Sequence, residues 1–290
     1  MFYPNYKIKA NFFNFQNLNE SQKADKGWEN SLRYFRIKDI EYINEPPRKN
    51  KTLLQLAFSF GRNKILKRLL PRNVLLSIDK NLLQPIFNCF GLYIPLRSAP
   101  TLRRSFSRKI FYSSYSWNVS QFDFIRNTLL EYFTPVHDLL PHNLELLNDI
   151  MNSESVCVTI RRGDFLSPKN ASLFNVCNEE YFITAMKAMR EEIQNCKFFV
   201  FSDDIEDVKR VMHFPFEVIY ERGNDPVWEK LRLMYSCRHF IISNSTFSWW
   251  AQYLGRNPNK IVYAPIPWLW GRGNGESIYQ SYVRTIQCHR

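Results

Sequence analysis

The sequence predicts an α/β protein with a parallel sheet of Rossmann type. Short β-branched or aromatic runs alternate with helix-like segments from Val156 to Ala264, a pattern typical of such sheets. Polar motifs follow three of these runs, at the strand ends where ligands bind in this fold class. Of the 290 residues, 45% are hydrophobic and 16% aromatic, which excludes intrinsic disorder as the main state.

The second half of the chain carries the clearest elements. Strands are expected at 156–160, 198–201, 218–220, 240–243 and 260–264, with 260–264 as the last strand. A helix should begin near Asn178, because Glu179 and Glu180 suit the positive end of a helix dipole. Further helices are expected at 203–212, 226–235 and 246–254.

The first half is less regular. Residues 1–55 are polar and weakly periodic, and 71–150 mix short helices and loops, with apolar periodicity at 122–133. Residues 52–70 place apolar and basic side chains at helical spacing, which indicates a basic amphipathic helix. Such a helix packs on a core or lies on a membrane surface, and core packing is the safer interpretation. We therefore divide the chain into an N-terminal domain, 1–150, and a C-terminal domain, 151–290.

The positive charge is concentrated in the first half. The net charge is +12, of which residues 1–150 carry +10 (22 basic against 12 acidic residues). Residues 48–109 hold fourteen basic residues and one acid, Asp79. Such a field attracts phosphorylated substrates, an anionic leaflet or nucleic acid, unless it is merely a solvated surface. Nucleic acid is the weakest of these, since no such motif occurs and the excess avoids the motif-bearing half.

Cysteine spacing and hydropathy indicate the compartment. The six cysteines show no C-x-x-C and no regular spacing, so reduced cytosolic thiols are expected. The opening residues lack the apolar stretch of a signal peptide, and no apolar run reaches membrane-spanning length. We expect a cytoplasmic protein, with peripheral contact at the inner face of the membrane through 48–109 as a further option.

Phosphate binding would depend on side chains and helix ends. Only 9 glycines occur, and neither G-x-G-x-x-G nor a Walker A sequence is present. Arg161 and Arg162 follow the strand at 156–160 and can grip a diphosphate through forked hydrogen bonds, with Asp164 orienting one guanidinium. The alternative is a surface arginine pair bridged to Asp164.

Two further motifs follow strands. Asp203 and Asp204 can accept hydrogen bonds from a ribose or a guanine, or Asp203 can form a helix cap with Glu206. Residues 243–248 gather hydroxyl and amide side chains at a helix start, a glycine-free anion site. The five histidines are scattered, and no metal cluster is evident.

At this point the motifs resemble those of a known family. The sequences VTIRRGDF (158–165), FFVFSDD (198–204), LMYSCRHFIISNSTFSWWA (233–251) and NPNKIVYAP (257–265) follow one another as in the α-1,2-fucosyltransferases of glycosyltransferase family 11. The match is close from Val156 to Pro265 and faint upstream. It implies a GT-B fold of two Rossmann-like domains with parallel sheets, GDP-β-L-fucose as donor, no metal or other cofactor, and inversion at the sugar carbon.

Family resemblance and residue chemistry together assign the donor site. Arg161 would bind the β-phosphate and act in catalysis, Arg162 would support it, and Asp203 or Asp204 would read the guanosine. The candidate donor-binding residues are Thr159, Arg161, Arg162, Asp164, Asp203, Asp204, Ser243, Asn244, Ser245, Thr246, Phe247 and Ser248. No catalytic base is named.

Two departures from the family pattern stand out. Thr159 replaces the usual histidine, so we expect Thr159→His to tighten donor binding or to raise turnover. The family's opening strand and its G-G-x-G-N-Q loop have no counterpart before Lys7, so we expect an incomplete N-terminal domain. Two hypotheses follow: an active galactoside α-1,2-fucosyltransferase, acting on a lipid-linked or surface galactose-containing glycan, or an inactive truncated remnant that still binds GDP-fucose.

Overall fold

The computed structural model describes residues 8–11, 31–38, 40–43, 70–90, 92–93, 111–112, 123–271 and 278–290. The chain divides into two compact units. The first comprises Met1–Ile8 and Asn44–Phe122, and the second comprises Lys9–Ile43 and Asp123–Arg290. Each unit is described by itself below.

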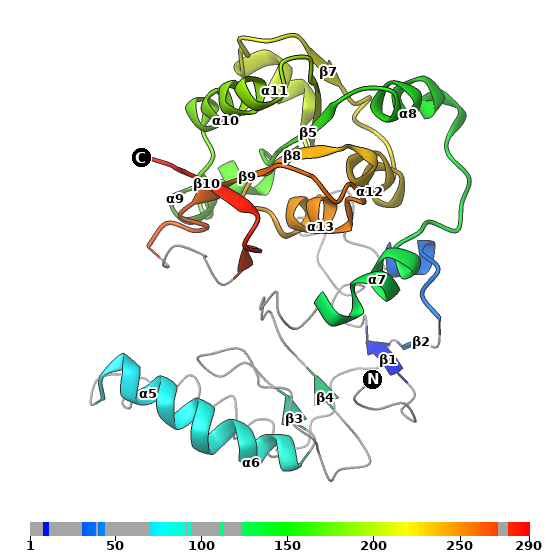
Figure 1. The fold of residues 1–290 in the computed structure, drawn as a ribbon. Helices are drawn as coiled ribbons and strands as arrows, with labels where there is room; N and C mark the ends of the chain where they lie inside the picture. Colours follow the sequence, from blue (N-terminus) through cyan, green and yellow to red (C-terminus); the bar gives the residue numbers. More distant parts are fainter. Residues whose placement is uncertain are drawn as a thin grey trace. The chain divides into compact units, whose positions relative to one another are not determined.

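A six-stranded parallel sheet forms the centre of the second unit (Figure 1). Its strands are β5 (Ser155–Ile160), β6 (Lys197–Ser202), β7 (Val218–Tyr220), β8 (His239–Ile241), β9 (Val262–Ile266) and β10 (Val283–Gln287). They lie in the order β10-β9-β8-β5-β6-β7, and every pair is parallel. Counted from β7, this is the 3-2-1-4-5-6 order of the Rossmann fold, so the expected α/β class is confirmed.

Helices cover both faces of this sheet. One face packs against α10 (Glu179–Glu192) and α11 (Ile205–Val211), through buried side chains such as Phe182, Met186 and Val208. The other face packs against α12 (Val227–Ser236) and α13 (Thr246–Leu254). Successive residues of β5 alternate between the two cores, as the two-residue period of a strand requires. The strand order runs outward from β5 to β7 on one side and from β8 to β10 on the other, so the switch point of this topology lies between β5 and β8.

Segments before residue 151 also belong to the second unit. The helices α7 (Arg126–Tyr132) and α8 (Leu144–Met151) place Leu129, Leu147 and Ile150 in the core on the α12 side. Phe35, next to the short helix Ser31–Tyr34, lies in the same core and bridges to Pro135. These apolar side chains pack into the core of the second unit. The boundary between the units therefore falls before Asp123 and not at the expected residue 150. Short 3-10 helices at Asp123–Ile125 and Pro141–Asn143 precede α7 and α8.

Most expected elements of the second half are present, with two differences at the strands. The ladder of β8 stops before Ser243, because the Ser243 amide donates to the Thr159 hydroxyl at 3.1 Å. The expectation that 260–264 is the last strand is wrong, since β10 pairs with β9 at the sheet edge. Arg284, Thr285 and Gln287 of β10 are exposed, so this edge strand lacks the apolar run that marks buried strands.

The described part of the first unit is mainly one helical rod. The segments α5 (Arg72–Ile78), a five-residue π-helical turn (Asp79–Leu83) and α6 (Gln84–Cys89) follow one another without a break (Figure 1). The strands β3 (Leu92–Tyr93) and β4 (Phe111–Tyr112) form a parallel pair. The pair of β1 (Ile8–Asn11) and β2 (Ile40–Ile43), by contrast, belongs to the second unit except for Ile8. The expected helix at 52–70 falls almost wholly outside the described residues, and an N-terminal Rossmann-like domain stays a prediction.

Candidate functional site

Arg161 stands at the carboxyl end of β5 between two carboxylates. Its Nη2 donates to Asp164 Oδ1 at 2.7 Å, and its Nη1 lies 3.2 Å from Asp203 Oδ2. The guanidinium also lies over the Phe165 ring, 5.4 Å from the centroid. These carboxylates engage two of the five N–H groups of a guanidinium. With 27% of its side chain exposed, Arg161 is held in place and still accessible to a ligand.

Arg162 has a different set of partners. Its backbone N–H donates to Asp203 Oδ1 at 2.8 Å, and its Nε donates to Asp207 Oδ2 at 2.6 Å. The hydrogen bond from Arg162 is the main cause that lowers the pKa of Asp207, and Arg210 adds to it. The two neighbouring arginines are therefore not a free pair. Each is anchored to its own carboxylate, which agrees in part with the alternative of a bridged arginine pair.

Asp203 and Asp204 have different hydrogen-bond partners. Asp203 connects the ends of β5 and β6 through Arg161 and Arg162. Asp204 caps α11, because its Oδ1 accepts from the Asp207 amide at 3.1 Å. The expected cap by Asp203 with Glu206 is thus displaced by one residue, and Glu206 pairs instead with Lys209 at 2.7 Å. Asp204, and not Asp203, directly precedes α11, so only Asp204 stands at the N-cap position.

The loop at 243–248 is held mainly by internal hydrogen bonds. Ser243 Oγ and Ser248 Oγ lie 3.1 Å apart and both residues are buried. The buried Asn244 donates through Nδ2 to the carbonyls of Phe174 and Trp268, both at 3.0 Å. The α13 helix then begins with Ser245 as its N-cap residue, which makes no side-chain capping bond.

Accessible groups in this loop are fewer than its sequence suggests. Thr246 is exposed, Phe247 is half-buried and Ser245 is buried. A ligand at this end of the sheet would therefore meet the exposed Thr246 and the start of α13. Of the predicted hydroxyl and amide donors, Ser243, Asn244 and Ser248 are instead engaged within the protein.

Thr159 is a structural link across the switch point. Its side chain is buried, and its Oγ1 accepts from the amide of Ser243. This bond connects the end of β5, where the arginines begin, to the end of β8, where the serine loop begins. A histidine here would have to replace that bond and find room in a closed core, and the effect of Thr159→His on donor binding stays a prediction.

A buried ion pair beside the site was missed at the sequence level. Glu221 follows β7 and is fully buried, and its Oε1 accepts from the Ser202 amide at 2.7 Å. Lys230 Nζ lies 2.9 Å from the same oxygen and donates to the Ser202 carbonyl at 2.8 Å. The pair thus binds both the amide and the carbonyl of Ser202, the residue that precedes Asp203. An acid directly after the third strand was the available signal.

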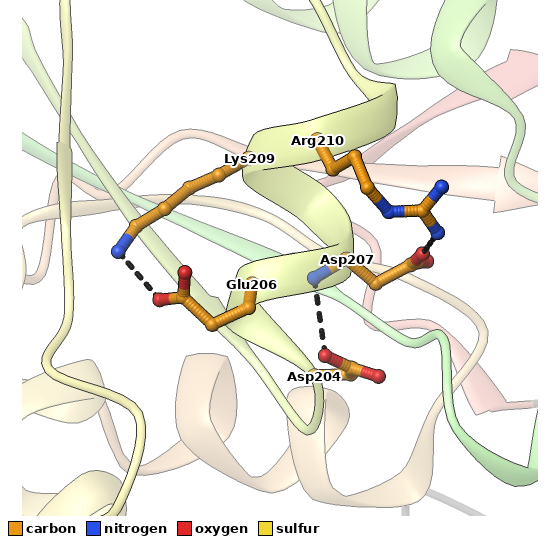
Figure 2. Close-up of a pocket in the computed structure, with 5 residues that line it drawn as sticks. All are labelled: Asp204, Glu206, Asp207, Lys209 and Arg210. Atoms are coloured by element: carbon orange, nitrogen blue, oxygen red, sulfur yellow. Dashed lines mark hydrogen bonds and ion pairs between the residues drawn. The ribbon is translucent and has the colours of Figure 1, made fainter.

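An open depression of about 560 Å³ lies over α11. It is lined by Asp204, Glu206, Asp207, Lys209 and Arg210. In Figure 2, Lys209 pairs with Glu206 and Arg210 pairs with Asp207, so these charges largely satisfy one another. Glu206 and Arg210 are about three quarters exposed, which makes this a solvated helix surface next to Asp203.

Among the residues that the structure describes, no group of three or more histidine, cysteine or acidic side chains is arranged to hold a metal ion. In the same part of the chain, no helix combines the length and apolar character needed to cross a bilayer.

The sheet order defines a doubly wound α/β protein, and Arg161 and the start of α13 follow adjacent strands beside its switch point, which is where ligands bind in this fold class. The sequence model of glycosyl transferase family 11 matches residues 93–268, and the chain belongs to this family, as its motifs indicated.

Two relatives from Escherichia coli are similar to this chain. One, an alpha-1,2-colitosyltransferase, is 37% identical over 149 residues, covering 50% of this chain and 51% of the relative. The other, the O-antigen biosynthesis glycosyltransferase WbnK, is 28% identical over 179 residues, covering 59% of each. The chain therefore spans between half and three fifths of the length of the curated relatives it matches.

Two solved structures show a distant likeness to this chain. A family 9 glycosyl transferase from Veillonella parvula is 12% identical, with a TM-score of 0.35 over 65% of this chain and 53% of that one. The ADP-heptose heptosyltransferase II of E. coli is 10% identical, with a TM-score of 0.31 over 69% and 55%. Both TM-scores are too low for either likeness to say anything further about the fold.

Proposed function

We propose that this protein is a galactoside α-1,2-L-fucosyltransferase that transfers fucose from GDP-β-L-fucose, with inversion and without a metal ion. The observation that carries the proposal is Arg161, held by Asp164 and Asp203 at the switch point of a Rossmann-type sheet. Membership of glycosyl transferase family 11 supplies the reaction class, a sugar moved from a nucleotide donor to a glycan.

Departure of the nucleotide requires positive charge at the diphosphate. When the bond between the sugar carbon and the β-phosphate oxygen breaks, the leaving GDP gains a negative charge, and the transition state resembles an oxocarbenium ion. Fixed cations and dipoles that are oriented beforehand stabilise such charge without reorganising. Arg161 would contact the β-phosphate, and the start of α13 with Thr246 would approach it from the other side of the switch point.

Asp204 suits the nucleoside better than Asp203 does. Both carboxylate oxygens of Asp203 are engaged by the two arginines. Asp204 is exposed, and its capping bond uses Oδ1 alone (Figure 2). Its second oxygen can accept a hydrogen bond from the ribose or from guanine. Asp203 would then act as a positioning residue for Arg161.

The donor sugar has two candidates. The 37% identical relative is named as a colitosyltransferase, and colitose differs from fucose by the lack of the hydroxyl at carbon 3. A transferase that hydrogen-bonds this hydroxyl would discriminate strongly against the deoxy sugar. Fucose is our proposal because the motifs at 158–165 and 233–251 match those of the fucosyltransferases. GDP-colitose is the second donor to be tested.

The acceptor proposed is a galactose-containing glycan, and a lipid-linked precursor is one form of it. The relative WbnK is named as an enzyme of O-antigen biosynthesis, which supports a polysaccharide acceptor. An inactive protein that retains donor binding is the alternative, and it predicts nucleotide affinity without transfer. The residues assigned here bind the donor, and we assign no residue as the base toward the acceptor.

Calorimetry with GDP and GDP-fucose, with and without EDTA, tests donor binding. We expect binding that chelator leaves unchanged, and a loss of about a hundredfold or more in Arg161→Ala, because a charge-assisted fork is removed. Arg161→Lys should recover little of it, since a point charge lacks the fork geometry. Arg238→Ala is the matched control. This half-exposed arginine directly precedes β8, at the amino ends of the strands, and pairs with Glu154.

Transfer is measured separately, with a β-galactoside acceptor and each of the two donors. Formation of an α-1,2-fucosylated product from GDP-fucose supports the proposal. Binding without transfer from either donor would favour the inactive alternative. Preferential use of GDP-colitose would correct the donor sugar while leaving the diphosphate site intact. Donor binding that survives Arg161→Ala would refute the assignment of the site itself.

A further inference from the structure

Three histidine side chains of the described residues lie against carboxylates, and one of them stands at the ligand-binding edge of the sheet. His213 lies between α11 and β7, and His239 begins β8, so both are at the amino edge. His142 pairs instead with Asp225, which lies between β7 and α12. A segment that leads from a strand to its helix is at the carboxyl edge, where Arg161 also stands and where ligands bind in this fold class.

The imidazole of His142 is accessible, whereas its carboxylate partner is buried. The His142 side chain is 44% exposed and that of Asp225 is 4% exposed. Nε2 of His142 lies 2.7 Å from Oδ1 of Asp225. Because an ionised carboxylate can only accept, Nε2 carries the ring proton and Nδ1 keeps its lone pair. An accessible imidazole oriented by a buried carboxylate is an arrangement in which histidine acts as a base.

A hydrogen-bond network fixes the carboxylate in turn. Asn143 Nδ2 donates to Asp225 Oδ2 at 2.8 Å and to Glu229 Oε1 at 3.2 Å. The same oxygen of Glu229 accepts from the Leu140 amide at 2.9 Å, and its Oε2 lies 3.2 Å from Arg232 Nη1. The charged groups of the network are thus two carboxylates and one guanidinium. They hold the turn that carries His142 against the first turns of α12.

The two faces of the sheet place His142 on the sugar side of the proposed donor. Asp204 begins α11 on one face, whereas α12 and α13 pack against each other on the other face (Figure 1). Both α12 and α13 follow parallel strands, so their starts lie at the carboxyl edge, about 8–10 Å apart as in packed helices. A nucleotide sugar with its nucleoside at Asp204 and its diphosphate at Arg161 would therefore direct its sugar towards the face that carries α12.

We propose that His142 takes the proton of the acceptor hydroxyl and that Asp225 is its positioning residue. This inference rests on the proposed fucosyl transfer, whose donor residues supply no base. The acceptor hydroxyl gives its proton to Nδ1 while its oxygen forms a bond to the sugar carbon. The bond from that carbon to the β-phosphate oxygen breaks, and its electron pair leaves with GDP. Asp225 stabilises the resulting imidazolium, which then releases the proton to water.

His142→Gln tests the base without removing the contact to Asp225. The glutamine amide can still donate to this carboxylate, but it cannot take a proton. With GDP-fucose and a β-galactoside, we expect kcat to fall about a hundredfold or more, since a general base contributes a factor of this size. The affinity for GDP, measured by calorimetry, and the melting temperature should stay as in the wild type.

Two further readouts separate a base from a structural residue. Transfer by the wild type should fall towards acid pH, because a protonated imidazole cannot take a proton, and the residual activity of His142→Gln should lack this fall. Free imidazole should restore part of the transfer in His142→Ala, because it can occupy the accessible space that the side chain leaves. Asp225→Asn should lower kcat with little effect on GDP affinity.

His213→Gln is the matched control. This side chain is 84% exposed and lies 3.8 Å from Glu179, at the amino edge of the sheet. The variant makes the same substitution in another histidine that faces a carboxylate, away from the donor site. It should bind GDP and transfer fucose like the wild type.

The possible failures can be told apart. Transfer by His142→Gln at the rate of the wild type would overturn the role of the base and leave the donor site standing. A parallel loss of GDP affinity in this variant would overturn it too, by placing His142 among the donor-binding residues. A wild type that binds GDP and transfers nothing would overturn it and favour the inactive alternative. Absence of GDP binding by the wild type would overturn the proposed function itself, and this inference with it.

Discussion

Lys230→Met should destabilise the protein far more than the same substitution at Lys209. Both lysines form ion pairs of similar length, 2.9 Å to Glu221 and 2.7 Å to Glu206. Their burial differs: the side chains of Lys230 and Glu221 are 14% and 0% exposed, whereas those of Lys209 and Glu206 are 40% and 77% exposed. The pairs therefore separate the effect of burial from that of distance.

The magnitudes follow from what each substitution leaves behind. Removing Lys230 leaves the Glu221 carboxylate buried without its cation, and a broken buried pair costs about 3–5 kcal/mol. The bond from Lys230 to the Ser202 carbonyl is lost as well. Removing Lys209 returns an exposed carboxylate to water, which costs about 0.5 kcal/mol or less. Urea denaturation at neutral pH gives the two free energies of unfolding.

The pH dependence of the stability of Lys230→Met gives a second, independent test of this prediction. Burial raises the pKa of Glu221, and the loss of Lys230 removes a charge that opposes this rise. A carboxyl group whose pKa is higher in the folded state stabilises the fold at low pH, and this stabilisation is lost as the pH rises through the folded-state pKa. The stability of Lys230→Met should therefore fall, relative to the wild type, as the pH rises above the ordinary pKa range of a glutamate carboxyl.

A double variant isolates the charge. In Lys230→Met combined with Glu221→Gln, the glutamine oxygen still accepts from the Ser202 amide, and no buried charge remains, so much of the stability should return. Equal small losses for Lys230→Met and Lys209→Met would refute this reasoning. So would a loss at Lys230 that does not change with pH.

Three further predictions concern single side chains. Thr159→Val should cost about 1–3 kcal/mol in urea denaturation, because the Ser243 amide loses its buried acceptor, whereas Thr159→Ser should cost less; equal losses would contradict the role of the hydroxyl. Asp204→Ala should lower stability by about 1 kcal/mol through loss of the α11 cap, and Asp204→Asn should not; equal losses would show that the charge matters more than the cap. Burial lowers the pKa of Lys260 to about 7, so stability should rise with pH from about 7 towards 10, and Lys260→Met should flatten this rise; an unchanged slope in the variant would assign the dependence to other groups.

The order of elements in the second half could be predicted from the sequence because local patterns encode it. A run such as 156–160 is apolar apart from Thr159, and a short run of this kind is typical of a strand buried on both faces. The stripe of Phe182, Met186 and Met189 has helical spacing, and these three side chains are fully buried. The family could be recognised for the same reason, since its motifs are short and contiguous. The edge strand β10 was missed because an exposed strand carries no such pattern.

The partners of the site residues were decided by tertiary structure. The sequence placed Arg161, Asp203 and Ser243 after strands, and such residues gather at one edge of a parallel sheet. Only the pairing of β5 with β6 and β8 sets Arg161 beside Asp203 and Thr159 beside Ser243. The same holds for Lys230, which meets Glu221 because α12 returns over the sheet. Hydrophobic periodicity is a local property of the chain, whereas hydrogen bonds and ion pairs between distant residues depend on which strands become neighbours, and that is settled by packing the whole core at once.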